Sequence, residues 1–66
     1  MRKLTYKIVE ETDRTQSIKW VEFITDRTSQ WTEEQYLRNR SNTTMELVRD
    51  EETEEKEPLS REVKLG

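Results

Sequence analysis

The sequence contains no cysteine, no histidine and no alanine, and its single glycine is Gly66. Without cysteine the chain can form neither a disulfide nor a thiolate nucleophile. Without histidine it lacks the most frequent general base and the usual transition-metal ligand. A glycine-rich phosphate loop is excluded too, because such a loop needs several closely spaced glycines. We therefore expect a protein that is not an enzyme and holds no cofactor or metal, unless another chain completes a site.

Long apolar stretches are also missing. The most apolar part of the chain is the segment 17–25, and its uncharged apolar runs are far too short to span a bilayer. The first residues are basic, but they are not followed by the apolar stretch of a signal peptide. We predict a soluble, cytoplasmic protein without membrane contact.

The composition sets the size of the core. The chain has 66 residues, of which 41% are charged and only 29% are hydrophobic. This length allows one domain at most, with a small core. At this size the burial of apolar surface nearly cancels the entropy cost of ordering the chain. We therefore expect marginal stability, or support from a partner or a second copy.

Charge is distributed unevenly along the chain. Residues 1–49 carry nine basic and eight acidic side chains, whereas residues 50–66 carry three basic and seven acidic ones. Between residues 50 and 58 the only apolar side chain is the ring of Pro58. Such a segment cannot bury enough surface to offset its ordering entropy. We predict one domain over 1–49 and an acidic, flexible tail over 50–66, in which 59–65 either docks on the domain or stays loose.

Two strands are predicted in the first part of the chain. Apolar and polar residues alternate over 3–10, which is typical of a half-buried strand. The polar segment 11–16 then predicts a hairpin connection. The segment 17–25 is apolar on both faces, with Val21 and Phe23 on the opposite side from Ile18, Trp20 and Ile24. A bulge near Trp20 could instead bring all of them to one side.

A helix is predicted next. Thr32 and Gln35 have the spacing of a capping box, and Trp31 and Tyr36 have that of a hydrophobic staple. These signals predict a short helix over 33–40, followed by a third strand over 44–49. In an alternative interpretation one apolar stripe continues the helix to residue 50.

The resulting architecture is a small α+β fold. It has a three-stranded antiparallel sheet in the order strand, strand, helix, strand, with the helix packed on one face. A helix of eight residues is about 12 Å long and can cover only one face of the sheet. Either Ile18, Trp20 and Ile24 or Val21 and Phe23 must then meet something else. We assign Val21 and Phe23 to the uncovered face and predict that they bind a partner. Glu22, which lies between them, should pair with a base such as Lys7 or Arg49 or lie at a sheet edge.

The acidic segment is the second predicted partner-binding surface. Its carboxylates belong to Asp50, Glu51, Glu52, Glu54, Glu55 and Glu57. Regularly placed carboxylates can mimic a phosphate backbone and occupy a basic groove on a nucleic-acid-handling host enzyme. The alternatives are a solubilising tail and a tail that shields the arginines of its own chain.

Two further functions remain open. A small RNA- or DNA-binding regulator would use basic side chains interleaved with aromatic ones, namely Arg27, Arg38, Arg40, Arg49, Trp31 and Tyr36. Against it stands the net charge of −3, because affinity for phosphate needs a local positive excess. The other alternative is a structural homodimer in which two sheet faces pack together.

The small size, the missing residue types, the high charge and the single αβ layer resemble the small accessory proteins of bacteriophages and mobile elements. This resemblance is one of class and involves no motif. Many such proteins bind and block a host enzyme, so the resemblance implies a viral protein of this kind. We therefore predict a small, non-enzymatic protein–protein interaction module that inhibits or modulates another macromolecule by covering part of its surface.

Overall fold

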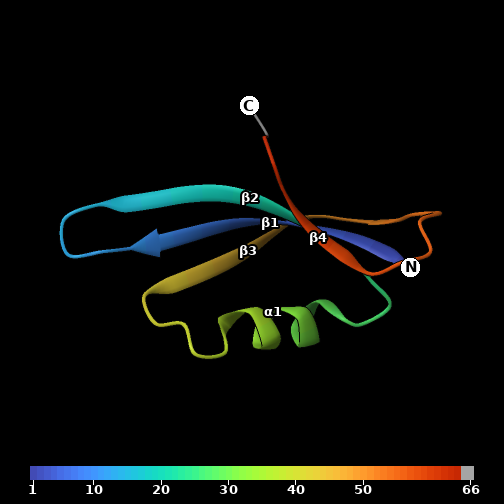
Figure 1. The fold of residues 1–66 in the computed structure, drawn as a ribbon, viewed down its shortest axis with the longest axis horizontal. Helices are drawn as coiled ribbons and strands as arrows, with labels where there is room; N and C mark the ends of the chain where they lie inside the picture. Colours follow the sequence, from blue (N-terminus) through green and yellow to red (C-terminus); the bar gives the residue numbers. More distant parts are fainter. Residues whose placement is uncertain (65–66) are drawn as a thin grey trace.

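The computed structural model describes residues 1–64 as a four-stranded antiparallel sheet with one short helix (Figure 1). In chain order the elements are β1 (Arg2–Glu11), β2 (Gln16–Thr25), α1 (Ser29–Leu37), β3 (Thr43–Glu52) and β4 (Leu59–Val63). The strands lie side by side in the order β3-β1-β2-β4. The central pair therefore comes from the first half of the chain and both edge strands from the second. Within residues 1–64 no helix has the length and apolar character needed to cross a membrane.

The predicted α+β class is confirmed, but the prediction of three strands is wrong. The fourth strand, β4, pairs antiparallel with β2, so that Arg61 lies opposite Glu22 and Leu59 opposite Ile24. The predicted acidic tail also begins inside β3, which extends to Glu52. The structure therefore confirms no separate tail over the part of 50–66 that it describes; Leu65, at the end of the predicted docking segment, lies outside the described residues.

The two predicted N-terminal strands are confirmed and form a hairpin. Their pairing runs from Arg2 opposite Thr25 to Glu11 opposite Gln16 without a register shift. The alternative bulge near Trp20 is therefore absent. The connection is closed by a backbone hydrogen bond of 2.8 Å from the Thr12 N–H to the Thr15 carbonyl.

The short helix is confirmed, but it begins one turn earlier than predicted. Its N-cap is Thr28, whose side-chain oxygen accepts a hydrogen bond of 3.1 Å from the Trp31 N–H. Thr32, the predicted cap, lies inside the helix with its side chain buried, and its hydroxyl donates to the Thr28 carbonyl at 3.0 Å. Because the helix starts earlier, Thr32 is itself a helical residue. It therefore lies on the same side of the helix as Tyr36, which is one turn further along.

The segment after the helix forms a strand, so the alternative of a helix continuing to residue 50 is wrong. β3 pairs with β1 along its length. The register shifts once, because Arg49 lies opposite Thr5 whereas Leu47 lies opposite Tyr6. Val48 is therefore an extra, bulged residue in β3.

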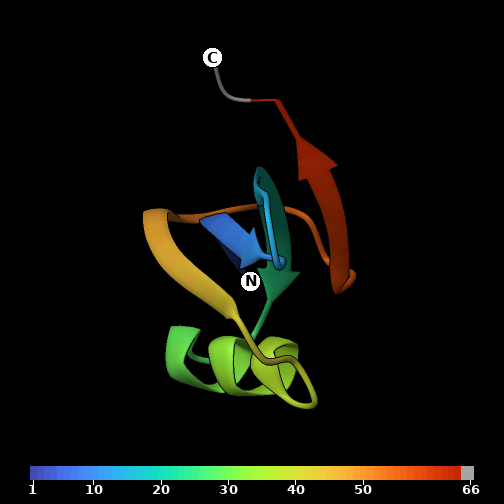
Figure 2. The same ribbon diagram turned by 90° about the vertical axis from the view of Figure 1, so that its left-hand side faces the viewer.

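The core lies between the sheet and α1, which covers one face only (Figure 2). Its buried residues are Leu4, Tyr6, Ile8 and Val21, and Phe23, Tyr36 and Met45 pack against them. The expectation that Val21 and Phe23 lie on the uncovered face is therefore wrong. The reason is the register, which places Val21 opposite Tyr6 and Phe23 opposite Leu4. The helix thus covers the face on which both central strands are apolar.

Candidate functional site

The sheet face opposite α1, which we call the open face, carries the side chains that the helix leaves uncovered. Because the directly paired residues of antiparallel strands share a face, the registers define its members. They are Lys3, Thr5, Lys7 and Val9 of β1; Ile18, Trp20, Glu22 and Ile24 of β2; Thr44, Glu46, Arg49 and Glu51 of β3; and Leu59, Arg61 and Val63 of β4. Ile24 and Thr5 of this face are buried although α1 does not cover them. Two groups among the other residues bear on function, one apolar and one charged.

The apolar group, which we call the apolar patch, consists of Val9, Ile18, Trp20 and Val63. Val9 lies opposite Ile18, and Trp20 lies opposite Val63. The Ile18 side chain is 48% exposed, and the other three are partly buried. The patch crosses three neighbouring strands and has an aromatic residue among its members. Contiguous apolar residues that stay at least partly accessible mark interaction surfaces more often than scattered ones do.

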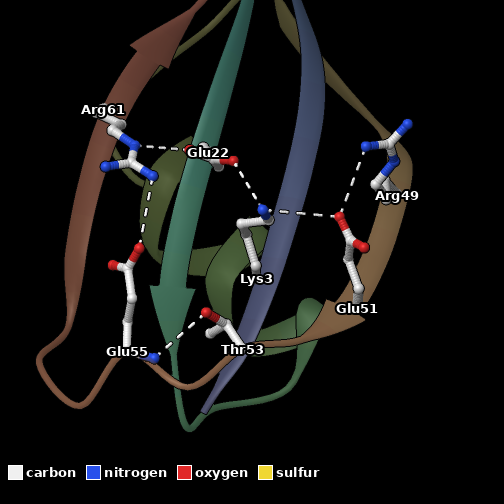
Figure 3. A network of polar contacts seen from close by, with 7 residues as sticks. All are labelled: Lys3, Glu22, Arg49, Glu51, Thr53, Glu55 and Arg61. Atoms are coloured by element: carbon white, nitrogen blue, oxygen red, sulfur yellow. Dashed lines mark hydrogen bonds and ion pairs between the residues drawn. The ribbon is translucent and has the colours of Figure 1, made fainter.

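The charged group is a network of ion pairs (Figure 3). Its members are Lys3, Glu22, Arg49, Glu51, Glu55 and Arg61. Glu22 accepts a hydrogen bond of 2.6 Å from Nε of Arg61, and its other oxygen lies 3.5 Å from Nζ of Lys3. Lys3 also lies 3.7 Å from Glu51, which in turn lies 3.6 Å from Arg49. The network therefore joins all four strands across the open face.

Glu22 is the central acid of the network and is almost fully buried. The hydrogen bond from Arg61 holds the pKa of Glu22 below its ordinary value, and the charges of Arg61 and Lys3 act in the same direction. Burial opposes this shift because it disfavours the charged form. The predicted partners, Lys7 and Arg49, are not the ones that Glu22 contacts. Lys3 and Arg61 could not be predicted as partners of Glu22, because the three residues belong to three different strands that are brought together only by the pairing of β1, β2 and β4.

The predicted acidic surface is divided in the structure. Asp50, Glu51 and Glu52 end β3, and Glu54, Glu55 and Glu57 lie in the connection to β4. The alternation along β3 places Asp50 and Glu52 on the face of α1 and Glu51 on the open face. Asp50 accepts a hydrogen bond of 2.6 Å from Nε of Arg2, and Glu55 lies 3.7 Å from Arg61. The carboxylates therefore do not form one row, and half of them pair with basic side chains of their own chain.

The predicted arginine cluster is also dispersed. Arg27 precedes α1 and lies over the Trp31 ring at 5.3 Å from its centroid. Arg40 follows α1, lies over the Tyr36 ring at 4.3 Å and donates to the Tyr36 carbonyl at 2.8 Å. Trp31 and Tyr36 are five residues apart in α1, which corresponds to about 7.5 Å along the helix axis and about 140° around it. Arg38 caps the helix C-terminus, and Arg49 lies on the open face. The structure does not bring the four arginines together.

Residues 1–64 contain no group of three or more acidic side chains placed to hold a metal ion. A hollow of about 260 Å³ lies where the start of α1 approaches the start of β4, and its lining includes Trp31, Pro58 and Leu59. The side chains of Trp31 and Leu59 are 42% and 38% exposed. The hollow is small and open to solvent, and we assign no ligand to it.

Comparison with known proteins does not assign the chain to a family. The chain matches no protein-family model, and no curated protein and no solved structure matches it at a significant level. The resemblance to accessory proteins of phages therefore stays a prediction. The open face is the feature from which a function can be argued.

Proposed function

We propose that this chain is a non-enzymatic protein-binding module whose docking surface is the apolar patch on the open face. The observation that carries the proposal is the exposure of Ile18, at 48%, on the face that α1 does not cover. A single exposed isoleucine would need no explanation. Here Ile18 lies next to Val9 and Trp20 on the same face. Tryptophan side chains that become buried when a complex forms are frequent energetic centres of protein interfaces.

The charges of the open face favour a protein over a nucleic acid as the partner. Three of its four basic side chains, Lys3, Arg49 and Arg61, are already paired with carboxylates. Lys7 is the one basic residue of this face for which residues 1–64 provide no ion pair. Electrostatic affinity for phosphate requires a local positive excess. The four basic side chains of this face are matched by four carboxylates once Glu55, which pairs with Arg61, is counted with Glu22, Glu46 and Glu51. The nucleic-acid regulator is therefore the less favoured alternative.

The same surface suggests the mode of action. The partner would present apolar side chains to the patch and a basic rim to the acidic end of the sheet. That end includes Glu52, Glu54 and Glu57, which are exposed and form no ion pair within the described residues. This acidic end lies away from the apolar patch, because Glu52 is opposite Arg2 at the start of β1 whereas Val9 of the patch is near the end of β1. Negative charge elsewhere on the same molecule still steers a basic partner over a distance and raises the rate of association. We propose that the module inhibits or modulates such a partner, for example a nucleic-acid-handling enzyme, by covering its surface.

A comparison of two matched variants tests the docking surface. Ile18→Asp places a charge in the patch, whereas Trp31→Asp removes a similarly exposed apolar side chain from α1, on the other side of the sheet. Tagged wild-type and variant proteins are used to capture proteins from cells of the source organism, and each captured protein is quantified. We expect Ile18→Asp to reduce capture of the partner by roughly tenfold, which corresponds to about 1.4 kcal/mol, and Trp31→Asp to retain it.

Circular dichroism on both variants first establishes that they are folded. Equal capture by wild type and by folded Ile18→Asp would contradict the proposed surface. Loss of capture after nuclease treatment would show that nucleic acid mediates the contact. That outcome would favour the alternative regulator function.

A further inference from the structure

We propose that β3 is a self-association edge at which two copies of this chain pair antiparallel, with the two-fold axis between Leu47 and Val48. In this register Glu46 of each copy lies opposite Arg49 of the other. The two sheets then join into one sheet of eight strands. This inference is independent of the proposed docking surface, because it uses the edge of the sheet and leaves the open face free.

The position of β3 makes it available for pairing. It is an edge strand with ten residues, twice the length of β4 at the other edge. Figure 2 shows β3 at the border of the sheet, with α1 below the sheet rather than beyond that border. The outer side of an edge strand presents backbone N–H and C=O groups that another strand can bind. Leu47 and Val48, at the middle of β3, are 39% and 51% exposed.

The bulge at Val48 determines in which registers residues of the open face of one copy lie opposite residues of the open face of the other. Glu46 lies opposite Lys7, and Arg49 lies opposite Thr5, so both belong to the open face although their numbers differ by three. In a regular strand two residues three apart would lie on opposite faces. Pairing about the point between Leu47 and Val48 therefore brings open-face residues of one copy opposite open-face residues of the other.

The same point is also the middle of β3, which runs from Thr43 to Glu52. All ten residues of the strand therefore pair when the axis lies there. Leu47 lies opposite Val48 of the second copy, so four exposed apolar side chains meet at the axis. An axis elsewhere would leave the end of each strand unpaired and part of this apolar surface in water.

Charge selects this register over its neighbours. Each dimer contains two Glu46–Arg49 pairs, and the row across the open face then reads Lys7, Glu46 and Arg49 of the second copy, with alternating sign. Sliding the copies by two residues in one direction would bring Glu46 opposite Glu51 of the second copy. Sliding them by two residues in the other direction would bring Glu46 opposite Leu47, which belongs to the other face. Like charges placed directly opposite each other destabilise strand pairs, whereas opposite charges stabilise them.

An edge contact is smaller than a typical obligate interface. Stable interfaces bury at least about 1,200 Å², and two strands that meet edge to edge bury less. We therefore expect a reversible dimer whose fraction rises with protein concentration. Because paired residues share a face, both open faces would lie on one side of the joined sheet and both helices on the other.

Reversal of the two charges tests the proposed pairing. Sedimentation velocity over a concentration series gives the dimer dissociation constant of the full chain. We expect Glu46→Arg and Arg49→Glu each to raise this constant by roughly tenfold, because each creates two pairs of like charges. The double variant Glu46→Arg/Arg49→Glu restores opposite charges and should return the constant to near the wild-type value. Asp13→Arg, at an exposed site in the connection between β1 and β2, makes the same change of charge away from β3 and should leave the constant unchanged.

Introduced cysteines test the register directly, since the chain has no cysteine of its own. Thr44 of one copy should lie opposite Glu51 of the other, on the open face. A mixture of Thr44→Cys and Glu51→Cys proteins should therefore form a mixed disulfide on oxidation. Two copies of either single variant should not cross-link, because their equal residues would be about 24 Å apart along the strands.

Several results would overturn the proposal. The proposal is overturned if the chain stays monomeric over the whole concentration series. It is also overturned if the double charge variant associates no better than either single variant. A mixture of the cysteine variants that cross-links no faster than each variant alone rejects the register. Association that is lost in Ile18→Asp but unaffected by the charge reversals would show that the copies pack face to face instead.

Discussion

Replacing Tyr6 with phenylalanine should weaken the packing of α1 on the sheet while leaving the shape of the core almost unchanged. Tyr6 is fully buried, and its ring contacts that of Phe23 edge to face with the centroids 5.8 Å apart. Its hydroxyl donates to Oε2 of Glu33 at 3.0 Å and lies 3.3 Å from the Ser29 carbonyl. Both acceptors belong to α1. The substitution therefore removes the polar link between helix and sheet and keeps the apolar one.

The expected loss follows from the type of hydrogen bond. A hydrogen bond to a charged group contributes about 1.5–3 kcal/mol to stability. Glu33 is only partly buried, so water can reach it after the hydroxyl is removed. We therefore expect Tyr6→Phe to lower the free energy of unfolding by about 1–2 kcal/mol. For a domain of this size each 1 kcal/mol lowers the Tm by about 4–8 °C.

Urea denaturation of Tyr6→Phe, Glu33→Ala and the double variant measures this contribution. The double-mutant cycle should give a coupling energy of about 1 kcal/mol between Tyr6 and Glu33. Additive effects of the two substitutions would refute the assigned hydrogen bond. Equal stability of wild type and Tyr6→Phe would refute the stated role of the hydroxyl.

The pH dependence gives an independent measurement at the same residue. Burial, followed by the hydrogen bond to Glu33, raises the pKa of Tyr6 above its ordinary value of 10.0. A raised pKa in the folded state means that this contribution is complete below pH 10.0 and is lost as the pH rises through the folded-state pKa. The wild type should therefore lose more stability at high pH than Tyr6→Phe does. The same alkaline loss in both proteins would contradict this assignment.

Two further predictions concern the open face and the helix start. The pKa of Glu22 is lowered, so its contribution to stability is present above its ordinary pKa of 4.5 and is lost as the pH falls through the folded-state pKa. Urea denaturation over the acidic range should show a smaller acid loss for Glu22→Gln than for wild type, and equal losses would contradict the role of Arg61 and Lys3. Thr28→Ala should lower the free energy of unfolding by about 1 kcal/mol, whereas Thr28→Ser should keep the cap. If thermal denaturation showed no effect of Thr28→Ala, Thr28 would not be the effective N-cap.

The elements of the fold could largely be predicted from local sequence patterns. The alternation over 3–10 and the apolar segment 17–25 identify two strands because side chains of a strand alternate between its faces. The cap and staple pattern identified a helix, but Thr28 and Thr32 are both acceptable caps in the sequence. The start at Thr28 is decided by packing, since it places Thr32 against the sheet, where its side chain is buried.

β4 was missed because its pairing partner is distant in sequence. Leu59 and Val63 alternate with polar residues, which permits a strand but does not say where it pairs. Its position depends on β2, where Arg61 meets Glu22 across 39 residues of sequence. The acidic residues before it obscured this contact, because a solvated segment and a connection between strands have the same composition.

The sequence by itself determined that thiol and imidazole groups are absent, because this depends on composition alone. It also determined the two central strands and a single short helix, because these depend on local periodicity. It did not determine which face the helix covers. β2 is apolar on both sides, and a slip of one residue against β1 would have exchanged its faces. Only the register of the hairpin, with Tyr6 opposite Val21 and Lys7 opposite Trp20, decided that Val21 and Phe23 became core. It thereby left Ile18 and Trp20 on the open face.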